Sequence, residues 1–341
     1  MVTKKQSLLD LLDRLTPEVR KAFLASIQDV KDNARIGQII DAIKAGNIDA
    51  AVKAVGMDAA AMRPLSAAVE SAYETGGIFT ASQFSRPVSQ AAFRFDVRNS
   101  RAEAWLRDYS SQAVTRITNE QLGLIRDVLN RGMNAGVNPR DMALDLIGRV
   151  GPNGRVGGII GLNGPQERYL ANAKRELAEL DANYFSRELR DKRFDSTVRK
   201  AIDSGTPLTQ EQIDKLSTRY SDNLLQWRGE TIARDQTLTA LNNSQNEAAR
   251  QLVESGAVDQ QDISREWDSA GDNRVRESHR EMNGQKVGMD EAFTTPDGAR
   301  LMYPGDSSLG APPEETIQCR CVVKLRVDYI RKARTNGGPS V

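Results

Sequence analysis

Cysteine is nearly absent from this sequence of 341 residues, and its two cysteines, Cys319 and Cys321, are two positions apart. A bridge between residues i and i+2 would be badly strained, so a disulfide framework is excluded. Aromatic residues are also scarce, at 5% of the chain. Aliphatic side chains and alanine must therefore form most of the core of a chain that is long enough for two or three domains.

Long apolar runs and an excess of one charge are missing as well. No run approaches the roughly 18 apolar residues that a membrane span requires. The N-terminal segment lacks the apolar stretch of a signal sequence, because Asp10, Asp13 and Arg14 interrupt it. Lys and Arg number 47 against 46 Asp and Glu, a net charge of +1. This balance excludes polyanion binding over the whole surface, though not a local basic patch. We expect a soluble chain made in a reducing cytoplasm.

Helix signals fill the first two-thirds of the sequence. Capping patterns predict helix starts at Thr16, Thr118, Asn138 and Thr209. A long helix is expected from about Gly229 to Ser255, because apolar residues recur there at helical spacing and Gly256 follows. The fold class is therefore mainly α, with elongated helical N-terminal and middle regions and a small C-terminal α+β module.

Glycine is concentrated in one segment, residues 151–165, at six of its positions. A phosphate-binding loop would need a following Gly-Lys-Ser/Thr at the head of a helix, and none is present. The segment is expected to be a flexible loop between helices, which contact with a partner could order.

The character of the sequence changes near residue 258, where turns replace helical periodicity and residues 322–327 predict a strand. We expect an N-terminal helical region (1–100), a long-helix or bundle region (101–257), a C-terminal α+β module (258–330) and a flexible basic tail (331–341). Residues 319–341 contain six basic residues and one acidic residue. That end could contact DNA or an acidic protein surface, or it could simply be solvated.

One chemical site is suggested by His279, the only histidine of the chain. Cys319 and Cys321 would share one face of a strand, and with this imidazole and a carboxylate such as Asp272 they would form a tetrahedral shell for zinc. Two alternatives stay open. The cysteines could pack as small buried hydrophobes beside a hydrogen-bonded histidine, or one of them could be a nucleophile that His279 activates and Asp272 orients.

Charges around this site are balanced, with four basic and five acidic residues between positions 264 and 281. Such a pattern favours internal ion pairs over contacts with phosphate. We expect Asp272 and the neighbouring arginines to form buried, charge-assisted hydrogen bonds. These bonds would tie the loop after Trp267 to the closing strand.

The order and spacing of these residues resemble the C-terminal domain of the phage Mu F-type (minor head protein) head morphogenesis family, over roughly residues 228–325. Residues 233–236, Ala-Arg-Asp-Gln, depart at their last two positions from the family's Ala-Arg-Thr-Glu-like string. The expected structural cluster comprises Trp267, Asp272, Arg274, Arg276, His279, Gly284, Cys319, Arg320 and Cys321. The likeness also includes a Pro-Gly-Asp turn at residues 304–306.

The resemblance implies a low-copy virion protein without enzymatic activity. Its expected partner is the phage portal protein at the inner capsid vertex, where it would assist procapsid assembly and DNA packaging or ejection. Scaffold protein, major capsid protein and packaged DNA are further expected contacts. The alternative is a metal- or cysteine-dependent hydrolase or transferase carried in the phage head, in which the same residues would line an open cleft. Zinc is the one cofactor that the residues suggest.

Overall fold

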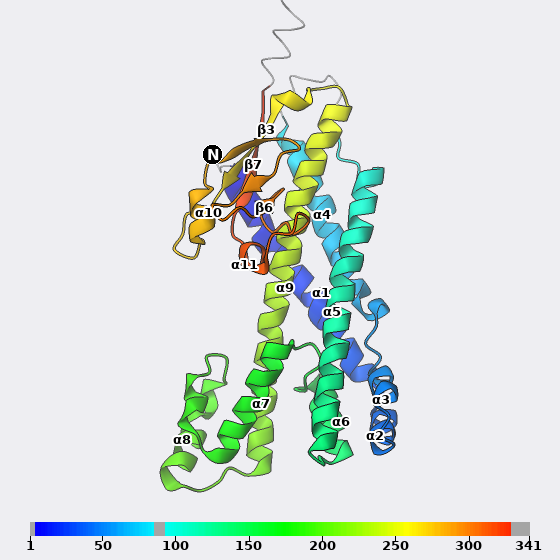
Figure 1. Ribbon diagram of the computed structural model, residues 1–341, viewed down its shortest axis with the longest axis vertical. Helices are drawn as coiled ribbons and strands as arrows, with labels where there is room; N and C mark the ends of the chain where they lie inside the picture. Colours follow the sequence, from blue (N-terminus) through cyan, green and yellow to red (C-terminus); the bar gives the residue numbers. More distant parts are fainter. Residues whose placement is uncertain (1–3, 85–92, 329–341) are drawn as a thin grey trace, which may run out of the picture. The chain divides into compact units, whose positions relative to one another are not determined.

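Long helices dominate this protein, and strands are mostly confined to its C-terminal part (Figure 1). The computed structural model describes residues 4–84 and 93–328, and 65% of it is helical. The predicted fold class, mainly α with a small α+β module, is confirmed. The expected basic tail at 331–341 lies outside the described residues. Among those described, no helix is both long and apolar enough to cross a membrane.

The elements are as follows in chain order. The helices are α1 (Lys4–Asn33), α2 (Ile36–Lys44), α3 (Ile48–Val55), α4 (Arg63–Gln83), α5 (Ser100–Asn134), α6 (Pro139–Ile147), α7 (Gly164–Glu179), α8 (Asp195–Ser204), α9 (Gln210–Glu254), α10 (Glu277–Glu281) and α11 (Pro313–Thr316). The strands are β1 (Arg149–Gly151), β2 (Gly154–Val156), β3 (Ile263–Asp268), β4 (Lys286–Gly288), β5 (Phe293–Thr294), β6 (Arg300–Leu301) and β7 (Val322–Val327).

The chain forms two compact units, each assembled from separated stretches of sequence. Unit 1 comprises Met1–Arg20, Ser66–Ser110 and Thr231–Val341, and unit 2 comprises Lys21–Leu65 and Ser111–Glu230. Helices α1, α4, α5 and α9 have residues in both units. The division of the chain at residues 100, 257 and 330, which follows sequence order, stays a prediction.

Two of the predicted helix starts are correct. Thr209 and Gln212 exchange both hydrogen bonds of a capping box at the start of α9, and the Asn138 side chain caps α6. From Thr209 the helix runs without a break through the predicted segment at 229–255, so one helix of 45 residues replaces two expected pieces. Gly256, with φ +74°, follows its end.

The other two predicted starts are wrong, since α1 continues through Thr16 and α5 through Thr118. The Thr16 hydroxyl donates to the carbonyl of Leu12 within the helix, 2.7 Å away, instead of accepting from an N–H at a helix start. Pro17 lies inside the same helix. A threonine can satisfy either kind of main-chain group, so its sequence pattern alone does not distinguish a helix start from a helix interior.

Unit 1 has a three-stranded antiparallel sheet with the order β4-β3-β7 and a separate antiparallel pair, β5-β6. The predicted strand at 322–327 is present as β7. In the β3–β7 pairing, Trp267 lies opposite Val323 and Asp268 lies opposite Val322. The segment that follows β3 and the segment that precedes β7 therefore lie at the same end of this strand pair.

The glycine-rich segment of unit 2 is part of a packed core, and the expectation of a flexible loop is wrong. It begins with the β1–β2 hairpin and continues through residues 157–163, which we call the glycine strap. The apolar side chains buried in this strap are Ile159, Ile160 and Leu162. The glycines are needed for the backbone conformation of the strap. Gly157, Gly158 and Gly161 all have positive φ angles, which other residues adopt only at a cost in free energy.

Side chains from three helices bind the main chain of the glycine strap. Lys31 Nζ donates to the Gly157 carbonyl over 2.8 Å, and Arg228 Nη1 donates to the Gly161 carbonyl over 2.9 Å. The Gly161 N–H in turn donates to Gln121 Oε1 over 2.8 Å. These partners replace the hydrogen bonds that a helix or sheet would have supplied to a buried main chain.

We expect Gly161→Ala to lower the free energy of unfolding by about 3 kcal/mol, because positive φ and overpacking both penalise the new methyl group. A Cβ at this position would lie 2.6 Å from Leu225 and 2.7 Å from Ile27. Chemical denaturation followed by circular dichroism measures the change. Gly164→Ala is the matched control, since a Cβ there meets nothing nearer than 3.6 Å. Equal denaturation midpoints for the two variants would contradict a packed strap.

Burial lowers the pKa of Lys31 to about 8, although Asp222 and Asp32 act in the opposite direction. The unfolded chain keeps this proton to higher pH, so stability should rise as pH passes upward through the folded-state pKa. Relative to Lys31→Met, the wild type should gain about 2 kcal/mol between about pH 7.5 and about pH 9.5. Urea denaturation at several pH values tests this, and parallel pH profiles for the two proteins would refute it.

Candidate functional site

Unit 1 brings the only histidine and both cysteines of the chain together. His279 lies on α10, in the segment that follows β3, and Cys319 and Cys321 lie directly before β7. The antiparallel pairing of β3 with β7 carries these two segments to one edge of the sheet. We call His279, Cys319 and Cys321 the thiol–imidazole group.

Both sulfur atoms of the group face the same ring nitrogen. Cys319 Sγ lies 3.4 Å and Cys321 Sγ lies 3.6 Å from His279 Nδ1, and one donor atom from each residue lies within 4.8 Å of the other two. All three side chains are buried, with at most 1% of each residue exposed. The convergence predicted from the sequence is therefore present for these three residues.

The other ring nitrogen of His279 faces a carboxylate that the sequence analysis did not identify. Glu315 Oε2, from α11, lies 2.8 Å from His279 Nε2. The hydroxyl of Ser278 donates to the same oxygen over 2.9 Å. The distance is that of an ion pair, although Nε2 makes no contact with hydrogen-bond geometry.

The thiol–imidazole group belongs to the apolar core of unit 1. Trp267 is fully buried, and its ring meets His279 and Phe293 edge-on, with centroid distances of 5.0 and 5.2 Å. Edge-to-face contacts of this kind orient rings as well as burying their area. Core side chains from α1 and α9 also contribute to this core, namely Leu8, Leu11, Leu12, Leu238 and Leu241.

The two cysteines affect one another's ionisation in opposite directions. Hydrogen bonding from Cys319 and from His279 lowers the pKa of Cys321. The pKa of Cys319 is raised by its hydrogen bond with Cys321 and by burial.

Asp272 is placed outside the thiol–imidazole group, against the expectation that its carboxylate would complete the shell. It accepts hydrogen bonds from Arg320 Nε and Nη2, over 3.0 and 2.9 Å. The two side chains are about one-third exposed, so this ion pair is not the buried one that we expected. Arg320 lies between the two cysteines in an extended segment, and alternation directs it away from their face.

The neighbouring arginines have separate roles. Arg274 is 69% exposed and lies 3.8 Å from Asp272. Arg276, which precedes α10, donates to the carbonyl of Ile317 and so joins the histidine segment to the chain before the cysteines. Gly284, also expected in the cluster, has φ +84° and donates its N–H to the Trp267 carbonyl over 2.8 Å.

Helix α9 holds the main chain directly before Cys319. Asp235 accepts a hydrogen bond from the N–H of Gln318 over 2.6 Å, and the Gln318 side chain donates to Thr231 over 2.8 Å. Gln318 has φ +53°, an uncommon conformation for a residue with a side chain. Asp235 lies in the 233–236 string that departs from the family pattern, and its contact shows that a carboxylate acts there.

The Pro-Gly-Asp turn at residues 304–306 packs on the same helix. Asn242 donates to the Pro304 carbonyl over 3.1 Å, and Gly305 adopts φ +87°. Asp306 is buried and accepts a hydrogen bond from the N–H of Met302 over 2.8 Å. The turn thus docks on α9.

Arg265 is a further residue that sequence reasoning missed. Its guanidinium is buried and donates to the carbonyls of Gly288, Met302 and Glu291. It also lies over the Phe293 ring, 5.4 Å from the centroid. Burial lowers its pKa to about 10. No pattern in the sequence signals a buried cation that binds main-chain oxygens at this position.

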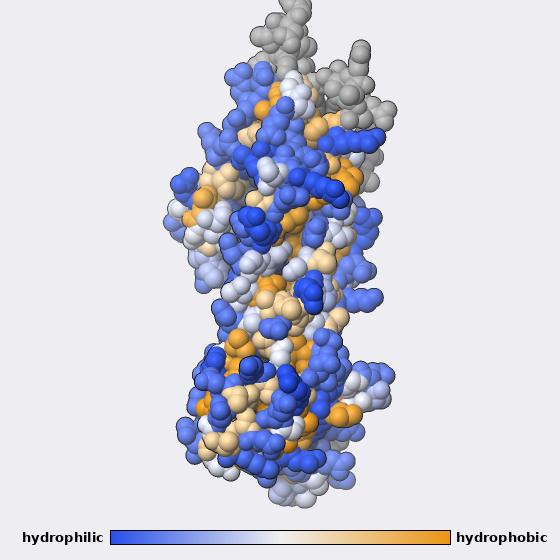
Figure 2. Space-filling model, turned by 90° about the vertical axis from the view of Figure 1, so that its right-hand side faces the viewer, coloured by the Kyte–Doolittle hydropathy of each residue, from blue (hydrophilic) through white to orange (hydrophobic). Residues whose placement is uncertain are grey.

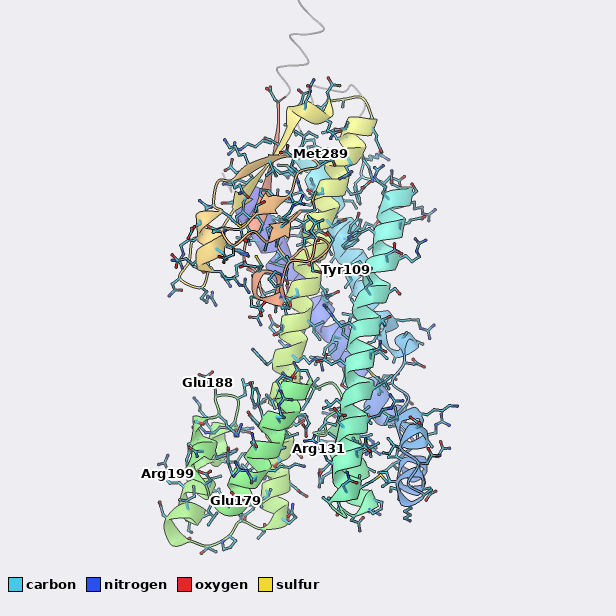
Figure 3. All side chains as sticks on the ribbon, in the orientation of Figure 1. Tyr109, Arg131, Glu179, Glu188, Arg199 and Met289 are labelled. Atoms are coloured by element: carbon cyan, nitrogen blue, oxygen red, sulfur yellow. The ribbon has the colours of Figure 1, made fainter. Side chains whose placement is uncertain are left out.

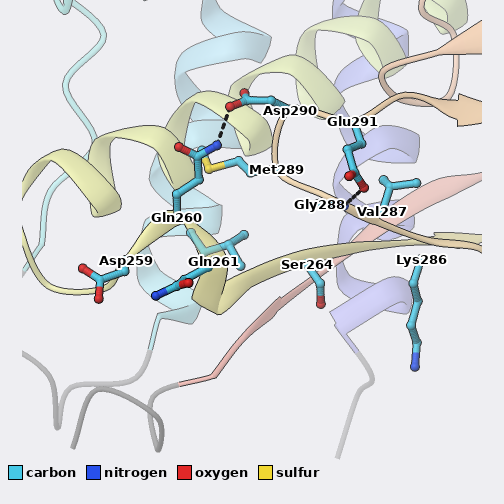
Figure 4. Close-up of a pocket in the computed structure, with 11 residues that line it drawn as sticks. Asp259, Gln260, Gln261, Ser264, Lys286, Val287, Gly288, Met289, Asp290 and Glu291 are labelled. Atoms are coloured by element: carbon cyan, nitrogen blue, oxygen red, sulfur yellow. Dashed lines mark hydrogen bonds between the residues drawn. The ribbon is translucent and has the colours of Figure 1, made fainter. Parts of the chain in front are cut away.

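A cleft of about 650 Å³ lies beside β3 and β4 (Figure 4). Met289 and the ion-paired Asp290 line it, with Gln260 hydrogen-bonded to Asp290. No member of the thiol–imidazole group lines this cleft. The cleft is therefore not an access route to the buried sulfurs.

We expect Arg265→Lys to lower the free energy of unfolding by about 3 kcal/mol, because a lysine cannot reach three carbonyls at once and leaves buried oxygens unsatisfied. Arg274→Lys is the control, since that side chain is 69% exposed and its replacement should change stability by less than about 0.5 kcal/mol. Thermal unfolding compares them. Indistinguishable melting temperatures would show that the Arg265 bonds contribute nothing.

The comparisons with known proteins bear on this region. Residues 192–324 match the family model described as Phage Mu protein F like protein, whereas no curated protein and no solved structure matches the chain. The match includes α8, α9, β3, the thiol–imidazole group, Asp235 and the turn at 304–306. It confirms the family resemblance proposed from the sequence. Residues 192–324 of this chain are thus similar to the phage Mu protein F-like family.

Proposed function

We propose that this chain is a minor head protein of a tailed phage, a structural part of the virion that acts in head morphogenesis. The observation that carries the proposal is the family match, which contains the α9 contacts and the whole thiol–imidazole group. In this proposal the chain is made in the host cytoplasm and binds the portal protein at the inner vertex of the capsid. There it assists procapsid assembly and DNA packaging or ejection.

Burial of the thiol–imidazole group supports a structural role and not an enzymatic one. Cys321, His279 and Glu315 have the order of a nucleophile, a base and an orienting carboxylate. A nucleophile must also be reached by a substrate, and Cys321 is only 1% exposed. The hydrolase or transferase alternative would require this core to open around Trp267.

Exposed charged helices are the proposed contact surface for head proteins. On α7, α8 and the segment between them, Glu179, Glu188 and Arg199 are exposed and extend outward (Figure 3). The face shown in Figure 2 is mostly polar, with apolar residues scattered among charged ones. Such a surface suits contacts that form during assembly between separately folded proteins. The portal is the first proposed partner, with scaffold and major capsid protein as further candidates.

Contact with packaged DNA has less support from the described basic residues near the C-terminus. Lys324 Nζ lies 3.2 Å from Asp268, and Arg326 Nε lies 2.7 Å from Glu266. Arg320 is paired with Asp272. These cations are compensated within unit 1, so any binding of DNA should be non-specific and sensitive to salt.

We expect the purified full chain to bind the portal protein encoded by the same genome, because docking at the portal is the central step of the proposed function. Analytical ultracentrifugation of the mixture would show co-sedimentation, and a portal protein from an unrelated phage is the control. In parallel, particles assembled without this chain should have reduced infectivity.

The proposal fails if the chain and its cognate portal sediment separately at assembly-like ionic strength. It also fails if particles that lack the chain are complete and fully infectious.

A further inference from the structure

We propose that His279, Cys319 and Cys321 bind one zinc ion, which fastens the C-terminal module of unit 1. The inference does not depend on the proposed role in the phage head, because it rests on the geometry of side chains within one chain. The metal would connect the segment after β3 to the segment before β7. These segments are 40 residues apart in the sequence at His279 and Cys319.

The first argument is the spacing of the donor atoms. A tetrahedral zinc ion holds nitrogen at about 2.0 Å and sulfur at about 2.3 Å, so adjacent nitrogen and sulfur ligands are about 3.5 Å apart. The two distances from His279 Nδ1 to sulfur are 3.4 and 3.6 Å. A zinc ion can therefore bind without rearrangement of these nitrogen–sulfur spacings.

The second argument is that two sulfur atoms converge on a single acceptor. An imidazole nitrogen has one lone pair, so it can accept well from only one of two thiols. Cys319 and Cys321 nevertheless both approach Nδ1, as the ligands of one ion do, within a buried core. One cation among the three atoms satisfies all of them together.

The third argument comes from the opposite side of the ring. Glu315 lies 2.8 Å from His279 Nε2, and Ser278 holds the Glu315 carboxylate. With Nδ1 bound to zinc, the remaining ring proton would lie on Nε2, which faces this carboxylate. This arrangement of carboxylate, histidine and metal recurs in zinc proteins, and it is independent of the cysteine spacing.

The donor set selects the metal and its role. Two sulfurs and an imidazole favour zinc over magnesium or calcium, which prefer oxygen ligands. Within residues 4–84 and 93–328, the group supplies three ligand side chains, so a water molecule would take the fourth position. Burial of all three ligands separates this position from substrates and assigns the metal to stability.

The test begins with the unaltered full chain, purified from zinc-supplemented cells without chelator and analysed by mass spectrometry for metals. We expect about one zinc ion per chain. Removal of zinc by a strong chelator should lower the melting temperature, and zinc alone should restore it. Cobalt substitution should give the intense visible bands of a tetrahedral site and the ultraviolet bands of thiolate ligation.

Variants assign the ligands. The double substitution Cys319→Ser with Cys321→Ser should abolish zinc binding, whereas Asp272→Asn should retain it, since Asp272 pairs with Arg320 outside the group. If the double variant does not fold, Glu315→Gln still decides the question. It keeps all three ligands and should weaken zinc affinity by about 10–100-fold.

Folded wild-type protein without zinc, and with a melting temperature unaffected by added zinc, would overturn the proposal. Equal zinc content in the double cysteine variant would also overturn it. Neither result concerns portal binding, so failure of the metal site and failure of the proposed function remain distinguishable.

Discussion

The convergence of two sulfur atoms on one imidazole nitrogen is the contact on which the C-terminal module depends. The strands around it are short, with only two residues each in β5 and β6. Pairing of β3 with β7 brings His279 to the cysteines, and Trp267 then packs between the imidazole and Phe293. Losing this convergence would remove the histidine from the core and leave the tryptophan without one of its two ring contacts.

Helix α9 gives this module its second support, and all of α9 lies within the family match. Asp235 and Asn242 bind the two irregular segments that approach the thiol–imidazole group, namely the residue before Cys319 and the turn at 304–306. These segments have no strand partners of their own at the positions bound. The matched residues therefore include both the module and the helix residues that hold its irregular segments.

The sequence predicted residue types better than it predicted partners. Alternation placed Cys319 and Cys321 on one face, and the rarity of histidine singled out His279. Asp272 was wrongly placed in the metal shell, because its pairing with Arg320 is a tertiary contact that the sequence does not show. Glu315 and Arg265 gave no signal, since each acts through a contact that only the tertiary fold creates. Glycine content misled us at residues 157–163, because composition does not distinguish positive φ from mobility.

Buried cations that bind main-chain oxygens recur in both units. Lys31 and Arg228 hold the glycine strap, and Arg265 holds the turns around β4 and β6. Most of these carbonyls lie outside helices and strands, Gly288 at the end of β4 being the exception, so a sheet ladder does not satisfy them. A carboxylate or an apolar side chain could not fill this role, because a carbonyl oxygen needs a hydrogen-bond donor and neither supplies one. A chain with few aromatic residues can thus build compact cores around irregular segments, with long cationic side chains supplying both packing volume and hydrogen bonds.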